Sequence, residues 1–216
     1  MESLLEGLLP AEVEIAGTSI RDCVELLMPE ERGLVASAVP KRQHEFATGR
    51  VLARELLGRL GHIDFPLLRE EDRIPVWPEG IVGSISHASH VCLAAVGRSA
   101  SSAGIGIDLE PDEPVESDIA RVVCRDAEHE WVAAEGEGER GRRCRVVFSV
   151  KEAVYKAFYP RTRTFWSFQD VGVVIDLDAG TWRARLPESA GVAEAEGRVA
   201  RREGWIVSAI ALPPIS

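Results

Sequence analysis

Apolar side chains recur with the helical period along two stretches of the chain. Between residues 41 and 61 they follow a spacing of about 3.6, which predicts a long helix that ends at Gly61. Residues 146–159, "VVFSVKEAVYKAFY", have the same character, and we expect Pro160 to end that helix. A third helix is expected over residues 116–135.

Shorter apolar runs predict strands between these helices. The second half of "IVGSISHASHVCLAAVG" is typical of a buried strand, and "GIGIDLEP" predicts another that Pro111 ends. After the last helix, "DVGVVIDL", "TWRARLP" and "GWIVSAIAL" predict two or three strands. The charged segment at 136–143, "GEGERGRR", is expected to be a mobile loop.

Two segments resemble each other within the chain. "FATGRVLAR" at 46–54 and "FSVKEAVYK" at 148–156 align at an offset of 102, so that Arg50 stands opposite Glu152 and Arg54 opposite Lys156. The match is short, and it hints at two related halves.

Composition excludes several classes of protein. The chain has 216 residues, of which 45% are hydrophobic, enough for the core of one large or two small domains. A net charge of −10 argues against nonspecific binding to nucleic acid or to an anionic membrane. No apolar run approaches the ~20 residues of a membrane span. The acidic N-terminal segment lacks the basic region of a signal peptide, and the four cysteines are scattered, so we expect reduced thiols and a cytoplasmic protein.

Two acidic residues end the strand "GIGIDLE". Asp108 and Glu110 are two positions apart, so on a strand they project to the same side while Ile107 and Leu109 face the core. Adjacent carboxylates repel each other unless a cation lies between them. A magnesium site is one interpretation, because Mg²⁺ takes a few carboxylates together with water and phosphate oxygens. A solvated strand end is the other.

The helix around residue 152 carries charges among apolar and aromatic neighbours. Glu152 and Lys156 are four residues apart on one face. They suit either an ordinary surface pair or a site where Glu152 completes a three-carboxylate magnesium centre and Lys151 and Lys156 face a phosphate.

Two further stretches carry candidate ligand-binding groups. In "WPEGIVGSISH", Gly83 allows close backbone approach, and Ser84, Ser86 and His87 follow it. Arg42 and Arg50 lie a little over two helical turns apart, so they form either a solvated basic face or a phosphate clamp.

Taken together, four blocks resemble the 4′-phosphopantetheinyl transferase superfamily, in its large monomeric surfactin-type and enterobactin-synthetase-type group. The blocks occur in order within residues 41–158: "KRQHEFATGR", "PVWPEGIVGSISH", "GIGIDLE" and "FSVKEAVYKAF". The resemblance implies a pseudo-dimer of two similar α+β halves with the active site in the cleft between them. Residues 1–103 would contact the phosphates and adenosine of coenzyme A, and residues 104–216 would hold the magnesium site and the catalytic helix.

The resemblance also implies roles for particular residues. Asp108, Glu110 and Glu152 match the magnesium ligands, and Asp108 also faces coenzyme A. Lys156 matches the lysine that contacts the diphosphate, and Lys151 matches a neighbour assigned to phosphate binding or to proton transfer. The remaining matches are expected to bind coenzyme A near its phosphates and adenosine: Arg42, Arg50, Arg73, Ser86 and His87.

The implied reaction moves 4′-phosphopantetheine from coenzyme A to a serine of an apo acyl, peptidyl or aryl carrier protein. Adenosine 3′,5′-bisphosphate is the other product. Glu152, or a metal-bound water, would take the proton of that serine. The resemblance favours a monomer of siderophore, polyketide or nonribosomal-peptide biosynthesis. A magnesium-dependent phosphohydrolase and an inactive coenzyme A-binding relative are the alternatives.

Overall fold

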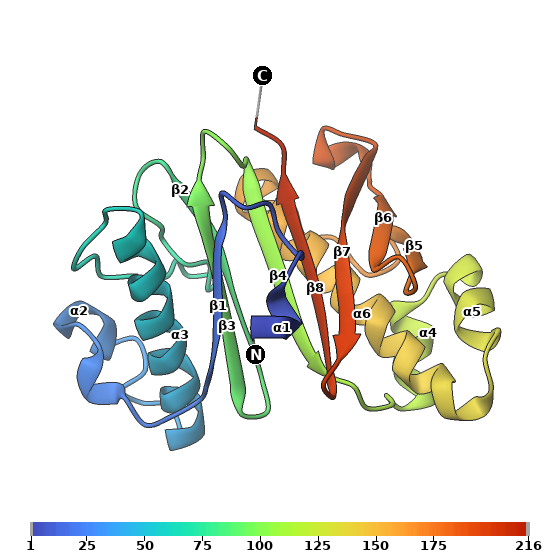
Figure 1. Cartoon of the computed structure of the whole chain (residues 1–216), viewed down its shortest axis with the longest axis horizontal. Coiled ribbons are helices and arrows are strands. Elements are labelled where there is room, and N and C mark those ends of the chain that lie inside the picture. Colours follow the sequence, from blue (N-terminus) through green and yellow to red (C-terminus); the bar gives the residue numbers. More distant parts are fainter. Residues whose placement is uncertain (1, 215–216) are drawn as a thin grey trace.

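Two antiparallel sheets lie side by side, and each is backed by one long helix (Figure 1). The computed structural model describes residues 2–214. The first sheet has the order β1-β3-β2, and α3 packs on it. These elements span β1 Glu14–Ser19, α3 Pro40–Arg59, β2 Ile81–Ala88 and β3 Val91–Arg98.

The second sheet is larger and has the order β4-β8-β7-β6-β5, with α6 packed across β4 and β8. Its strands and helix span β4 Gly104–Pro111, α6 Glu137–Thr162, β5 Gly172–Asp176, β6 Thr181–Arg185, β7 Glu194–Arg202 and β8 Trp205–Leu212. Short helices complete the described chain: α1 Glu2–Leu5, η1 Val24–Leu26, α2 Pro29–Arg32, α4 Ser117–Val123, α5 Asp126–Ala133 and η2 Glu188–Ala190. The expected α+β architecture of two halves is confirmed.

Helix α3 confirms the helix predicted for 41–61, and Gly61 follows it with a positive φ of 93°. Helix α6 is longer than predicted at both ends. The segment 136–143 is not a loop but the start of α6, where Glu137 and Glu139 suit the positive end of the helix dipole. Pro160 does not end the helix, which continues to Thr162. In the last turn the missing N–H costs one hydrogen bond only.

The single helix expected over 116–135 is two helices in the structure. Cys124 has an extended backbone, with φ −91° and ψ 139°, and it separates α4 from α5. Strands β1, β2 and β7 have no counterpart in the sequence predictions. In β7 the small residues Ala195 and Gly197 alternate with charged ones, and only Val199 of this strand is a buried hydrophobic residue, so the hydrophobic signal is weak.

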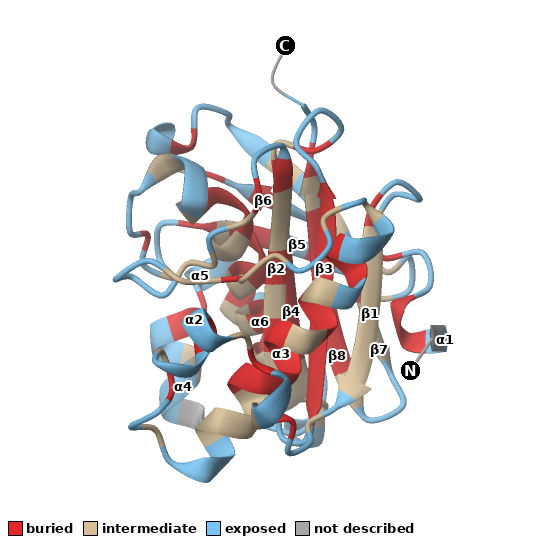
Figure 2. Ribbon diagram, turned by 90° about the vertical axis from the view of Figure 1, so that its left-hand side faces the viewer, coloured by how far each residue is buried: buried red, intermediate tan, exposed pale blue. Residues whose placement is uncertain are grey.

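Helix α6 lies directly on the backbone of β4. A Cβ added to Gly104 would lie 2.5 Å from the Ala157 carbonyl oxygen, and one added to Gly106 would lie 1.9 Å from that of Ala153. Buried residues concentrate on these layers (Figure 2). The two glycines thus set how closely α6 approaches the strand that carries Asp108.

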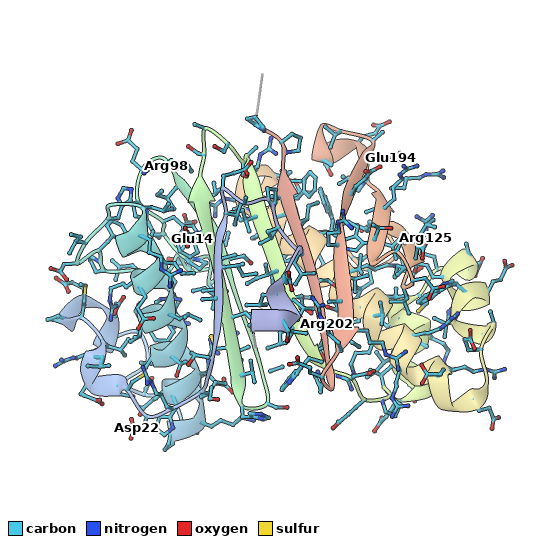
Figure 3. All side chains as sticks on the ribbon, viewed as in Figure 1. Glu14, Asp22, Arg98, Arg125, Glu194 and Arg202 are labelled. Atoms are coloured by element: carbon cyan, nitrogen blue, oxygen red, sulfur yellow. The ribbon has the colours of Figure 1, made fainter. Side chains whose placement is uncertain are left out.

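The N-terminal segment crosses over to the second half. Leu4, Leu5 and Leu8 join a core cluster with residues of β4 and β8. Arg202, labelled in Figure 3, donates hydrogen bonds to the carbonyl oxygens of Leu4 and Glu6. The first residues therefore tie the second sheet to the first half.

We predict that Gly106→Ala destabilises the protein strongly. The new methyl group meets the α6 backbone, which has no room to move, so a loss of about 3 kcal/mol or more is expected in urea unfolding. Gly138→Ala is the control, because a Cβ there meets nothing within 4 Å in a helix, where alanine stabilises by about 1 kcal/mol. Equal stability of the two variants would contradict the close contact.

Candidate active site

The two sheets meet at a seam that serine hydroxyls close. The backbone N–H groups of Ile107 and Leu109 on β4 donate to the hydroxyls of Ser84 and Ser86 on β2, at 3.1 and 3.2 Å. These bonds replace the strand pairing that β4 lacks on this side. They bring the edge of the first half against the strand of the paired acids.

Asp108 lies in this seam and is 4% exposed. Its Oδ1 accepts hydrogen bonds from the Ser86 hydroxyl at 3.1 Å and from the Lys156 ammonium at 2.7 Å. Of the two interpretations of this strand end, the solvated one does not hold for Asp108, because β2 and α6 both pack against β4. Strand, seam and helix together produce a buried carboxylate–lysine pair.

The two neighbouring acids, Glu110 and Glu152, are partly buried close to Asp108. Burial, and then repulsion from Asp108, raises the pKa of Glu110, which pairs with Arg145 at 2.7 Å. Burial also raises the pKa of Glu152, an effect that Lys156 opposes and that Asp108 and Glu110 increase. Three carboxylates therefore interact electrostatically around the seam.

One atom of this group fits a hard cation. The Oδ2 of Asp108 is buried and has no hydrogen-bond partner. Among residues 2–214 no group of three His, Cys, Asp or Glu side chains forms a ready metal cage. Magnesium does not require one, since it is usually bound through one or two carboxylates with waters and substrate phosphates. The unpartnered oxygen and the raised carboxyl pKa values suit such an ion.

A basic cavity of about 240 Å³ opens beside the seam. Arg42, Arg50, Arg73, His87 and Lys156 all line it, as the resemblance implies for coenzyme A phosphates. They come from α3, β2, α6 and the turn before β2, which tertiary packing brings together. Four further residues line the same cavity and were not expected there from the sequence: Arg69, Trp77, Tyr155 and Tyr159.

Arg50 is unusual among these cations. It is 6% exposed, its guanidinium lies 4.3 Å from the ring centroid of Phe46, and its Nε has no partner. Burial lowers its pKa to about 10. A buried guanidinium with a free donor is poised for an anion, because the cost of desolvation is already included in the fold.

Arg42 and His87 form a second feature of the cavity wall. The Nη1 of Arg42 lies 2.7 Å from His87 Nε2. A guanidinium only donates, so this nitrogen accepts and the imidazole is neutral. Burial lowers the His87 pKa, which agrees with that protonation state.

Ser86 does not share the position of His87. Neighbouring residues of a strand face opposite sides, so Ser86 points into the seam while His87 points into the basic cavity. The Ser86 hydroxyl donates to Asp108 and accepts from Lys156 and Leu109, which uses its one donor and two lone pairs. It has no capacity left for a phosphate, and the expected contact with coenzyme A is corrected to a structural and positioning one.

Lys151 also differs from its expected place. Its side chain is 1% exposed and pairs with Glu128 at 2.7 Å. It donates further bonds to the carbonyl oxygens of Val123 and Phe168, so all three donors are used. The structure thus separates Lys151 from the basic cavity, and neither phosphate binding nor proton transfer agrees with this placement.

Glu152 and Tyr155 line a second, apolar cavity of about 560 Å³. The segment 165–171 and the end of α4 form its other walls. Phe165 and Val122 are exposed at its rim. Tyr155 lines both cavities, so a cationic compartment and an apolar compartment adjoin along α6.

Comparison with known proteins agrees with this geometry. Residues 30–97 match the model of the 4′-phosphopantetheinyl transferase N-terminal domain, and residues 104–209 match that of the 4′-phosphopantetheinyl transferase superfamily. The 4′-phosphopantetheinyl transferase Svp of Streptomyces mobaraensis is 44% identical over 97% of this chain and 89% of its own length. The chain belongs to the 4′-phosphopantetheinyl transferase superfamily.

Other relatives extend this superfamily assignment. The 4′-phosphopantetheinyl transferase PptT of Mycobacterium tuberculosis is 34% identical over 74% of this chain and 70% of its own length. Enterobactin synthase component D of Salmonella typhimurium is 31% identical over 69% of this chain and 62% of its own length. The resemblance found in the four sequence blocks is confirmed.

We predict that Glu152→Gln stabilises this superfamily member at neutral pH. The folded-state pKa of Glu152 lies above its unfolded value, so wild-type stability falls as pH rises from the ordinary pKa through the raised one. Glutamine does not titrate, so the gain appears above that range and vanishes at acidic pH. Thermal unfolding in chelator should show a rise of about 2–4 °C, the shift that about 1 kcal/mol produces at this chain length.

Glu130→Gln, at an exposed position of α5, is the control and should change little at either pH. If the Glu152→Gln protein is less stable than wild type at neutral pH, favourable interactions such as that with Lys156 already outweigh the cost of burying this carboxylate, which contradicts the prediction.

Proposed function

We propose that this chain transfers the 4′-phosphopantetheine group of coenzyme A to a serine of an apo carrier protein, as a holo-[carrier protein] synthase. The single observation that supports it most is the Asp108–Lys156–Ser86 cluster, whose Lys156 lines the basic cavity next to Tyr155, a residue that lines both cavities. The named transferases among the relatives support the same reaction. Neither a phosphohydrolase nor an inactive relative gains support from them.

Coenzyme A has two chemically different ends, and the two cavities match them. Its nucleotide end carries three phosphates, which suit the cavity of Arg42, Arg50 and Arg73. Its pantetheine arm is largely uncharged and suits the apolar cavity beside Phe165. The diphosphate that joins the ends would then lie near Lys156 and Asp108, where the bond must break.

Each residue of the seam has a proposed task in this reaction. Asp108, Glu110 and Glu152 would hold magnesium, which when bound supplies Lewis-acid stabilisation of charge on the diphosphate. Lys156 adds a positive contact to the same charge. Glu152 accepts the proton of the attacking carrier serine as a general base.

The two halves would divide the work. We propose that residues 1–103 bind the phosphates and adenosine, and that residues 104–216 hold the metal and the catalytic helix. The basic residues on α3 and β2 and the acids on β4 and α6 support this division.

We propose that the protein is a monomer, because one chain supplies both walls of the cleft. The proposed location is cytoplasmic, which the four free cysteine thiols support. Among residues 2–214 no helix is long and apolar enough to cross a membrane.

Acyl, peptidyl and aryl carrier proteins are the proposed partners. The relatives named as enterobactin synthase components favour siderophore biosynthesis, and polyketide and nonribosomal-peptide carriers remain within the proposal. Ile119, Val122 and Phe165 are exposed apolar side chains of α4 and of the cavity rim. We propose that a carrier docks on them, close to Glu152.

We predict that this chain, incubated with coenzyme A, magnesium and an apo carrier, adds one phosphopantetheine to the carrier by intact mass. Chelator and Asp108→Ala should abolish the gain, and Glu152→Gln should slow it by about 10²–10⁴-fold as expected for loss of a general base. Asp178→Asn, in the exposed turn after β5, is the matched control. Near-normal turnover of Glu152→Gln would contradict the assignment of the base.

We predict that Arg50→Met weakens coenzyme A binding without destabilising the free protein. Hydrogen bonds to charged groups contribute about 1.5–3 kcal/mol, so calorimetry should show about 10–150-fold weaker binding. The free protein loses a desolvated cation and should unfold at the same or higher urea concentration. Arg140→Met, at an exposed position, should change neither property; unaltered binding by Arg50→Met would remove Arg50 from the site.

A further inference from the structure

The buried Lys151–Glu128 pair joins five parts of the second half: α4, α5, α6, the segment 165–171 and β5. Glu128 Oε2 accepts the backbone N–H of Arg125 at the start of α5, and its Oε1 accepts that of Val173 on β5, both at 2.7 Å. Lys151 adds bonds to the end of α4 and to Phe168. Arg125, labelled in Figure 3, also lies against Gly172 of β5.

Two of these bonds hold the walls of the apolar cavity. Phe168 belongs to the segment 165–171, and Val123 ends α4. Gln169 of that segment also donates to the carbonyl oxygens of Val122 and Cys124. The lysine therefore fixes the distance between both walls and α6, on which Glu152 is the next residue.

The first half contains a matching arrangement that does not border the apolar cavity. Glu31 on α2 is fully buried and accepts the backbone N–H groups of Met28 and Leu67, both at 2.9 Å. Arg54 of α3 pairs with it at 2.5 Å. Arg54 is thus the structural counterpart of Lys151, although the sequence alignment places it opposite Lys156.

We propose that Lys151 and Glu128 are positioning residues that shape the apolar cavity for the pantetheine arm, and that neither touches a phosphate. This rests on the proposed binding of coenzyme A. A lysine with three protein acceptors at 2.7–2.8 Å has no donor for a ligand. Lys151 contributes to the reaction by positioning the pantetheine arm. The position of the arm in turn determines where the bond that breaks lies relative to Glu152.

The test uses two probes, coenzyme A and 3′-phosphoadenosine 5′-diphosphate, which carries the same phosphates without the arm. The variant is Lys151→Met/Glu128→Gln, because removing only one partner leaves a buried charge unpaired. We expect coenzyme A affinity to fall about tenfold or more while the armless probe binds as to wild type. Equal losses for both probes would show that Lys151 contacts phosphate and would overturn the proposal.

The matched control is Arg54→Met/Glu31→Gln, which removes the equivalent pair of the first half. It should leave the ratio of the two affinities unchanged, even where it lowers stability. A ratio altered as much as in the Lys151→Met/Glu128→Gln protein would mean that general destabilisation is responsible, against the proposal.

Hydrogen exchange of wild-type protein keeps the test valid if the double variant does not fold. Coenzyme A should protect the segment 165–171, and the armless probe should not. Protection by neither probe, with both bound, would overturn the positioning role and leave the proposed function standing. Failure of both probes to bind wild type would overturn the proposed function itself.

Discussion

The hydroxyl of Ser86 is the contact on which the arrangement of the site depends. Strand β4 pairs with β8 on one side only, and its N–H groups at Ile107 and Leu109 face the first half. Buried N–H groups need acceptors, and serine side chains of β2 supply them. Ser86 also contacts Asp108 and Lys156. The same hydroxyl that joins the two halves therefore orients the Asp108 carboxylate and the lysine that pairs with it.

Close packing of α6 on β4 is the second requirement. Only glycines at 104 and 106 allow the helix backbone to come within reach of the strand. The separation of Glu152 and Lys156 from Asp108 follows from that contact. Mutual burial then raises the pKa of Glu152 and leaves one Asp108 oxygen without a partner. The electrostatic properties of the site are thus consequences of backbone packing.

A buried glutamate joins backbone segments in each half. Glu31 and Glu128 each accept two N–H groups and one cation from the long helix. Removing one partner of such a pair is costly because the other is left charged and desolvated. The two halves therefore share a structural feature, as the weak internal repeat suggested. In the structure Arg54 corresponds to Lys151, whereas the sequence alignment places it opposite Lys156.

The sequence by itself determined the long helices, the strand of paired acids and the order of four motifs that indicates the superfamily. Local periodicity was sufficient, because helix and strand periods depend on near neighbours. It did not determine which polar groups remain free to act. Ser86 and Lys151 lie within recognisable motifs, yet distant partners occupy their hydrogen-bonding groups: Lys156 is 70 residues from Ser86, and Glu128 is 23 residues from Lys151. Hydrogen-bond capacity is set by such distant partners, so only the tertiary structure decided which residues of each motif face the cleft.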